Sequence, residues 1–175
     1  DCMSDEYEQW QHFKQGDEKA LEAIFLRYHK ELYLYGHKMC PMGTQVDDSI
    51  QDLFLELWVS RERLGNVVSL RAYLFRALKY KLLRAIKKER KLTALPADAD
   101  EFLEFSYETK LIADQEYLEE KKRLMKHIKQ LSPRQQEALY LRYYAHFSYS
   151  EISEIMAISQ QAVTNLVFKS IKGLR

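Results

Sequence analysis

The segment SLRAYLFRALKYKLLRAIKKERK, residues 69–91, decides how the rest of the chain is interpreted. It carries nine Lys or Arg residues against a single acid, Glu89. Apolar side chains share one arc of a helical wheel: Leu70, Leu74, Ala77, Leu78, Leu82 and Ala85. Aromatic and cationic side chains cover much of the other side: Tyr73, Arg76, Lys79, Tyr80 and Lys87. The segment therefore predicts one amphipathic helix with a buried face and a cationic face.

The cationic face indicates contact with an anion. Cations at this density bind phosphate by releasing condensed counterions, and rings among them give unpaired bases a surface on which to stack. This combination favours single-stranded or locally opened nucleic acid as the ligand. A solvated amphipathic helix, whose charges only keep the protein in solution, would have the same pattern, so both interpretations stay open on this segment alone.

The composition of the whole chain predicts an all-α fold. Its 175 residues are 46% hydrophobic, only 5 are Gly and 3 are Pro, and apolar residues recur mainly at helical spacing. The net charge of +1 conceals alternating blocks. Residues 1–70 hold 7 bases and 13 acids, residues 71–92 hold 9 and 1, residues 93–120 hold 1 and 9, and residues 121–175 hold 10 and 3.

Several kinds of site are not expected. The two cysteines, Cys2 and Cys40, provide neither a disulfide framework nor a zinc spacing, which fits a reducing cytoplasm. His29, His37 and Cys40 lack the spacing of a metal site. We also find no nucleophile with a matched acid and base, so no catalytic or cofactor-binding residues are predicted and an enzyme is not expected. No signal peptide or 18-residue apolar run is seen, so neither export nor membrane insertion is expected.

The first part of the chain predicts three helices before the cationic segment. A short helix covers residues 7–14, and Asp17 is a good N-cap for a second helix that ends near Cys40. The core positions of this second helix repeat at three and four: Leu21, Ile24, Phe25, Tyr28, Leu32 and Tyr35. A turn at residues 41–44 leads into a third helix over residues 45–60.

The third helix also predicts a docking surface. Four apolar residues already complete its inward seam: Val46, Ile50, Leu53 and Leu57. Leu55 and Val59 therefore project on the opposite side, among polar residues and beside two rings: Asp48, Gln51, Asp52, Phe54 and Trp58. Apolar groups rimmed by acids suit a basic partner. Coverage by another helix of the same domain would explain the pattern equally well.

The chain changes character after residue 92. Residues 93–115 combine Pro96, alternating Ala and Asp, and a run of acids, which predicts an acidic tether that is partly disordered in isolation. Such a tether could lie along a basic channel of a partner, or could simply keep the chain in solution. A charged helix follows at residues 116–130, and Ser132 and Pro133 then cap a further helix that ends near His146.

The last 27 residues have helix-turn-helix spacing. Apolar positions pack two short helices across a tight turn: Ile152, Met156, Ile158, Val163 and Leu166. The second helix would present its cap and its polar face outward: Ser159, Gln160, Gln161, Thr164, Asn165, Phe168, Lys169 and Lys172. Such a helix fits the major groove of DNA, although a plain helical hairpin would share this spacing.

Taken in order, these features resemble the extracytoplasmic-function (ECF) sigma factors of bacterial RNA polymerase. The resemblance rests on VDDSIQDLFLELW at 46–58, the cationic segment at 69–91, LSPRQQEALYLRYY at 131–144 and the C-terminal helix-turn-helix. It implies a sigma region 2-like bundle at 1–92, an acidic linker at 93–115 and a sigma region 4-like domain at 116–175. The wording QQAVTNL at 160–166 is most similar to members from the Bacteroidetes.

The resemblance also implies partners and residue roles. Core RNA polymerase would be bound through the clamp helices of its largest subunit and through its flap, with the clamp helices contacting one set of residues: Asp48, Gln51, Asp52, Phe54, Leu55 and Trp58. The minus-ten element of promoter DNA would be bound and melted by a second set: Tyr73, Phe75, Arg76, Lys79, Tyr80, Arg84, Lys87 and Lys88. The minus-thirty-five element would be read by the polar helix from Ser159 to Lys172. The tether would follow the RNA exit path, and an anti-sigma factor could be a further partner.

Two other functional classes stay open on sequence grounds. A helical adaptor would use only the apolar surface at residues 45–60. A two-domain helix-turn-helix regulator would bind duplex DNA unaided, whereas a sigma factor requires core polymerase.

Overall fold

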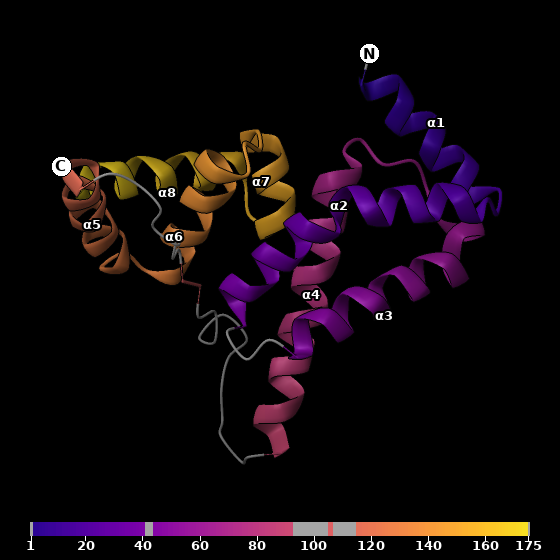
Figure 1. The fold of residues 1–175 in the computed structure, drawn as a ribbon, viewed down its shortest axis with the longest axis horizontal. Helices are drawn as coiled ribbons and strands as arrows, with labels where there is room; N and C mark the ends of the chain where they lie inside the picture. The colour runs from indigo at the N-terminus through magenta and orange to yellow at the C-terminus, as the bar shows by residue number, and fades with distance from the viewer. Residues whose placement is uncertain (1, 41–43, 93–104, 107–114, 175) are drawn as a thin grey trace. The chain divides into compact units, whose positions relative to one another are not determined.

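The computed structural model describes residues 2–40, 44–92, 105–106 and 115–174. Every regular element among these residues is helical, so the predicted all-α fold is confirmed. The chain divides into two compact units, Asp1–Leu95 and Pro96–Arg175, each with its own core (Figure 1). Most of the predicted acidic tether lies outside the described residues.

The first unit is a bundle of four helices: α1 (Cys2–Lys14), α2 (Glu18–Met39), α3 (Thr44–Ser60) and α4 (Leu70–Leu92). The helix α2 packs against each of the other three, and α3 also packs against α4 (Figure 1). Asp17 caps α2 as predicted, because its carboxylate accepts hydrogen bonds from the backbone N–H groups of Lys19 and Ala20. The predicted seam of α3 is confirmed, since Val46, Ile50, Leu53 and Leu57 are all buried.

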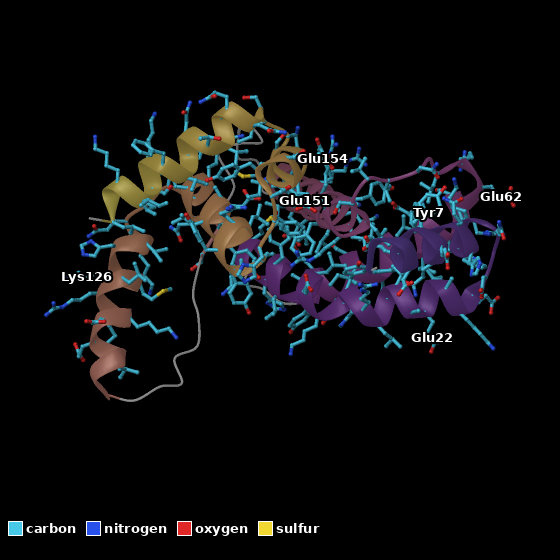
Figure 2. All side chains as sticks on the ribbon, turned by 90° about the horizontal axis from the view of Figure 1, so that it is seen from above. Tyr7, Glu22, Glu62, Lys126, Glu151 and Glu154 are labelled. Atoms are coloured by element: carbon cyan, nitrogen blue, oxygen red, sulfur yellow. The ribbon has the colours of Figure 1, made fainter. Side chains whose placement is uncertain are left out.

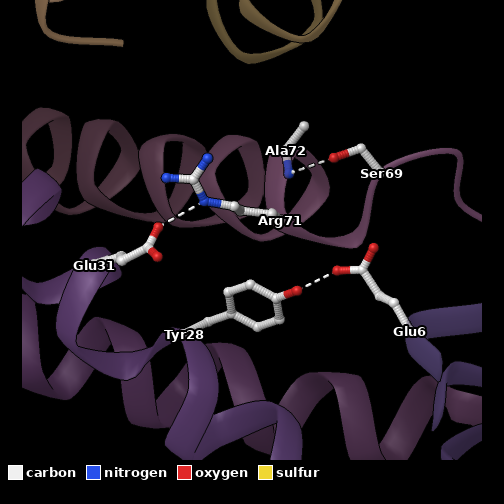
Figure 3. A network of polar contacts seen from close by, with 6 residues as sticks. All are labelled: Glu6, Tyr28, Glu31, Ser69, Arg71 and Ala72. Atoms are coloured by element: carbon white, nitrogen blue, oxygen red, sulfur yellow. Dashed lines mark hydrogen bonds and ion pairs between the residues drawn. The ribbon is translucent and has the colours of Figure 1, made fainter. Parts of the chain in front are cut away.

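The start of α4 is fixed by polar contacts (Figure 3). Ser69 Oγ accepts a hydrogen bond of 3.2 Å from the Ala72 backbone N–H, which caps the helix. The guanidinium of Arg71 pairs with the carboxylate of Glu31 on α2 at 2.6 Å. Between α3 and α4 the chain forms a short 3₁₀ turn, η1 (Arg61–Arg63), followed by the loop of residues 64–68.

The second unit contains α5 (Gln115–Lys129), α6 (Pro133–Leu139), η3 (Tyr140–Tyr144), α7 (Tyr149–Met156) and α8 (Gln160–Gly173). Ser132 and Gln135 form a reciprocal capping box at α6. The single helix predicted from Pro133 to His146 is instead divided, because η3 is a π turn. Arg142 Nη1 donates a hydrogen bond of 3.0 Å to the Phe147 carbonyl just beyond this turn.

Some positions differ from the sequence interpretation. Leu21 and Phe25 were assigned to the core, but both are only partly buried, because α3 covers one flank of this face and leaves the other open. Phe105 belongs to the predicted tether, yet it is buried, and its ring meets Tyr140 edge-on at 5.5 Å between centroids.

Neither a membrane span nor a metal cluster is found where the structure is described. Across residues 2–40, 44–92, 105–106 and 115–174, none of the helices combines the length and apolar character needed to cross a bilayer. The same residues bring together no group of three His, Cys, Asp or Glu side chains that could hold a metal ion.

Candidate nucleic-acid and partner interfaces

The helix α4 presents a cationic and aromatic surface to solvent. Its exposed members are Arg76, Tyr80, Arg84, Lys87 and Lys88. The Arg76 guanidinium lies over the Tyr80 ring, 5.5 Å from its centroid, so a cation and a ring share one patch. Two other cations of the helix are used internally, because Arg71 pairs with Glu31 and Lys81 pairs with Glu56.

A groove of about 560 Å³ runs beside this surface, between α3 and α4. Tyr73, Tyr80 and Arg84 form part of its α4 wall, and Asp52 and Glu56 lie on its α3 wall. Burial raises the pKa of the Tyr73 hydroxyl, so this group stays protonated and able to donate a hydrogen bond at neutral pH. The groove therefore offers a ring, a hydroxyl and a guanidinium to a flat polar ligand.

One of the predicted base-stacking residues is wrong. Phe75 is only 1% exposed and packs against Tyr35 of α2, with ring centroids 4.9 Å apart. The ring belongs to the core, because α2 crosses α4 at this turn. Tyr73 and Lys79 are partly buried, and the remaining members of the predicted set are exposed: Arg76, Tyr80, Arg84, Lys87 and Lys88.

A second, apolar surface lies on the α2 and α3 side of the same unit. Leu55 and Val59 are 64% and 73% exposed, as their positions on the helical wheel predict. Beside Leu55 is an open hollow of about 500 Å³, lined by residues of both helices: Glu18, Leu21, Phe25, Gln51, Phe54, Leu55 and Trp58. Phe54 is almost fully buried and packs edge-on against Phe25 at 5.0 Å.

The predicted docking residues border two depressions, one on each side of α3. Gln51, Phe54, Leu55 and Trp58 line the apolar hollow, whereas Asp52 lies in the groove beside α4. Asp48 is exposed but lines neither depression.

Helix α2, which was not predicted to be part of the docking surface, also contributes to it. Leu21 and Phe25 line the hollow, and Leu26 on the same helix is 69% exposed. The run Leu21, Ala23, Ile24, Phe25, Leu26 was a signal for this, because it is wider than one buried stripe requires.

The second unit has a helix-turn-helix at its C-terminal end. The helix α7 begins with a capping box between Ser148 and Glu151, and it ends at Ala157, which adopts the left-handed conformation with φ of 54°. The N-cap of α8 is Ser159, whose Oγ accepts a hydrogen bond of 3.1 Å from the Ala162 backbone N–H. Buried apolar side chains hold the two helices together: Ile152, Ile155, Met156, Val163 and Val167.

The outward face of α8 carries all of the predicted recognition residues. Each is exposed: Ser159, Gln160, Gln161, Thr164, Asn165, Phe168, Lys169 and Lys172. Gln161 Nε2 donates to Asn165 Oδ1 at 3.2 Å, and the Thr164 hydroxyl donates to the Gln160 carbonyl at 3.0 Å. These bonds restrict the amide side chains to a narrow set of orientations.

Charge is separated between the two helices of this motif. The acids Glu151 and Glu154 lie on α7 (Figure 2), whereas the helix α8 carries Lys169 and Lys172 and no acid. A polyanion would therefore meet α8 in preference to α7.

Comparison with protein families gives two matches. Residues 24–92 match sigma-70 region 2, and residues 121–174 match sigma-70 region 4. The first match spans most of α2 and all of α3 and α4, and the second spans most of α5 and all of α6, α7 and α8. No curated protein is significantly similar to the chain in sequence.

Several solved structures share the fold, among them the following two. The structure of CnrH in complex with the cytosolic domain of CnrY is 18% identical, with a TM-score of 0.65 over 97% of this chain and 94% of that chain. The sigma factor RpoE in complex with the anti-sigma factor NepR, from Bartonella quintana, is 20% identical, with a TM-score of 0.61 over 89% of this chain and 94% of that chain. At these identities the likeness establishes the fold.

Proposed function

Because the chain belongs to the sigma-70 family, with region 2 at residues 24–92 and region 4 at residues 121–174, we propose that it is an ECF-type sigma factor. In this role it binds core RNA polymerase, recognises promoter DNA and starts transcription without catalysing a reaction itself. The Bacteroidetes-like subtype stays a prediction from the wording of residues 160–166.

The observation that carries the proposal is the pairing of cations and rings on α4 beside a groove. Arg76, Arg84, Lys87 and Lys88 would hold the phosphates of the minus-ten element, and Tyr80 and Tyr73 would receive unpaired bases. Unstacking a base costs a few kcal/mol, and stacking on an aromatic side chain returns about 1–3 kcal/mol per base. Stacking therefore offsets much of the cost of unstacking, and the cations that hold the phosphates would add to it.

We propose that the apolar hollow between α2 and α3 docks on the clamp helices of the polymerase. An open depression floored by Phe54 and rimmed by Leu55, Trp58, Glu18 and Gln51 suits an amphipathic partner helix that carries basic residues. This surface lies between α2 and α3, whereas the groove proposed for DNA lies between α3 and α4. One unit could therefore bind polymerase and an opened strand together.

The second unit would read the minus-thirty-five element through α8. Gln161, Thr164 and Asn165 offer amide and hydroxyl groups to base edges, and Lys169 and Lys172 offer charge to phosphates. Polymerase flap contact by the same unit follows from the family assignment. Both similar structures are complexes with a second protein, one of them an anti-sigma factor, so we also propose that an anti-sigma factor binds this chain.

The test is transcription in vitro with core polymerase on a pool of promoters. The full chain should bind core polymerase and direct specific initiation. Replacing Lys87 and Lys88 together by Ala should lower open-complex formation on every promoter, and should reduce the slope of log affinity against log salt by roughly 0.7 for each lost phosphate contact. Lys30→Ala, which removes an exposed cation on α2, is the matched control and should change neither quantity.

Each component of the proposal has its own contrary outcome. Full activity of the Lys87 and Lys88 double variant at moderate salt would remove α4 from the DNA interface. A wild-type chain that binds duplex DNA alone but never associates with core polymerase would be a helix-turn-helix regulator. A chain that binds protein partners without any DNA dependence would be an adaptor.

A further inference from the structure

The helix α1 precedes the part of the chain that matches region 2, and it contacts the loop that leads into α4. The indole Nε1 of Trp10 donates a hydrogen bond of 3.1 Å to the Gly65 carbonyl. One residue further on, Gln11 Nε2 donates to Asn66 Oδ1 at 2.9 Å. Two consecutive side chains of α1 therefore hold two consecutive residues of the loop.

The same indole also contacts a ring of α4. Trp10 is only 2% exposed, and its ring meets that of Tyr73 in an edge-on arrangement, with centroids 6.1 Å apart and planes at 61°. Tyr73 and Leu64, the first residue of the loop, both line the groove between α3 and α4. Trp10 thus touches the loop and an aromatic wall of the groove at once.

The loop itself has little apolar burial to fix it. Gly65 and Asn66 are exposed, and Val68 is 95% exposed. Its entrance is held by Arg61, whose guanidinium donates to the Trp58 carbonyl at 2.8 Å and stacks 4.3 Å from the centroid of the Trp58 ring. The two hydrogen bonds from α1 hold the next part of the loop, at Gly65 and Asn66.

The helix α1 is in turn well anchored to the bundle. Phe13 is fully buried and packs near Trp58, and the Tyr28 hydroxyl of α2 donates a hydrogen bond to the Glu6 carboxylate (Figure 3). Burial, together with this hydrogen bond, raises the pKa of Tyr28, so the phenol remains a donor across the physiological range. Because α1 is fixed to the bundle, its hydrogen bonds can fix the loop in turn.

We propose that α1 is a positioning element for promoter opening, in which Trp10 and Gln11 hold residues 64–68 and Tyr73 in the geometry that the opened minus-ten strand meets. The inference rests on the proposed function, and it assigns a role to a helix outside the matched region. Trp10 and Gln11 are positioning residues, because they act through the loop and through Tyr73.

The first arm of the test uses the free full-length protein and needs no polymerase. Trp10→Phe keeps an aromatic ring in the core but removes the donor, and Gln11→Ala removes the second donor at a solvent-accessible position. Amide hydrogen exchange in residues 64–68 should become roughly two- to tenfold faster in each variant, because the loop opens more often once a bond to the Gly65 carbonyl or to Asn66 Oδ1 is lost. Glu8→Ala, at an exposed position of α1, is the matched control and should leave this exchange unchanged.

The second arm measures promoter opening with core polymerase. Each variant should form about three- to tenfold less open complex at limiting polymerase, with unchanged affinity for core polymerase and an unchanged preference at the minus-thirty-five element. Gln11→Lys retains a donor toward Asn66, so it should form more open complex than Gln11→Ala. If residue 11 only stabilised the fold, open-complex formation would not depend on whether its side chain can donate a hydrogen bond. Thermal unfolding of each variant checks that the first unit remains folded.

The two arms separate the possible failures. Unchanged exchange in residues 64–68 would show that α1 does not hold the loop. Faster exchange with normal opening would show that the hold has no role at the promoter. If the wild-type chain does not initiate transcription, the proposed function fails, and a positioning role in promoter opening fails with it, whatever the exchange arm shows about the loop.

Discussion

At the scale of single residues, Gln161 and Asn165 are the most informative side chains of the second unit. Their amides are joined by a hydrogen bond of 3.2 Å one helical turn apart on the exposed face of α8. In this arrangement Gln161 keeps its amide oxygen and one N–H, so its side chain can donate to N7 and accept from N6 of an adenine in the major groove.

We expect Asn165→Ala and Gln161→Ala to change base preference at one or two positions of the minus-thirty-five element, at about 1–3 kcal/mol for each lost bidentate contact. Lys169→Ala, on the same face, should weaken binding of all sequences alike, because a lysine that contacts phosphate carries no sequence information. Initiation from a library randomised at this element measures both effects. Identical base preferences in all three variants would exclude the two amides from sequence readout.

Helical periodicity predicted the burial of single residues well where one neighbouring helix determines which side chains are covered. Val46, Ile50, Leu53 and Leu57 are buried as predicted, and Leu55 and Val59 are exposed as predicted. Periodicity failed at Phe25, which lies at the edge of its apolar arc, and the family resemblance failed at Phe75. Their exposure depends on where a second helix crosses, and that is set by contacts such as Phe75 with Tyr35, which are 40 residues apart in sequence.

At the scale of the helices, local chemistry predicted the helix starts. Asp17, Ser132 and Ser159 all cap helices as their residue types indicate, because an N-cap requires only a short polar side chain and the next three amides. The π turn at η3 could not be predicted in the same way. It coincides with tertiary contacts of Arg142, whose guanidinium reaches the Phe147 carbonyl and lies 4.7 Å from the Tyr149 ring centroid.

The packing of α2 on α3 depends on the absence of a side chain at Gly36. A Cβ at this position would lie 2.6 Å from Val46 Cγ1, far inside normal carbon contact, and Val46 is fully buried. Gly36→Ala gains about 1 kcal/mol of helix propensity, but overpacking a filled core costs about 1–3 kcal/mol. We expect a net loss of stability in the first unit of up to about 2 kcal/mol.

Tryptophan fluorescence during denaturant titration measures this loss. Both tryptophans, Trp10 and Trp58, belong to the first unit, so the signal reports that unit alone. Gly65→Ala is the matched control, because a Cβ there would meet no atom within 4 Å. A Gly36→Ala variant more stable than the wild type would mean that Val46 can move aside, and that α2 and α3 are not in fixed contact.

At the scale of the whole molecule, the alternating charge blocks of the sequence correspond to different surfaces. The cationic block of residues 71–92 lies within α4, and the cations Lys169 and Lys172 lie on α8, the helix that we propose reads DNA. The sequence also predicted a docking surface on α3, but it could not show that residues of this surface line two different depressions. Gln51 and Asp52 are neighbours in sequence, yet one lines the α2 side and the other lines the α4 side, because successive helical residues point 100° apart.

The chain between the two units contains an anchor that composition did not indicate. Phe105 is 2% exposed and packs on Tyr140, so the second unit effectively begins ten residues before α5. Twelve residues separate Leu92, the last residue of α4, from Phe105, and this length can span at most roughly 45 Å. Without the Phe105 contact, the connection would extend from Leu92 to Gln115, the first residue of α5, and its maximum length would be roughly 80 Å.

This difference in reach predicts how the protein selects promoters by spacer length. With Phe105 in place, the shorter connection should confine initiation to a narrow range of distances between the two promoter elements. Phe105→Ala removes the ring that packs on Tyr140, so the permitted range should widen and initiation at the best spacing should fall, since a longer connection lowers the effective concentration of one unit near the other's site. Phe105→Leu keeps an apolar side chain and should behave like the wild type. The measurement is initiation on promoters that differ only in spacer length, and an unchanged profile for Phe105→Ala would mean that the Phe105 contact does not limit how far apart the two units can act.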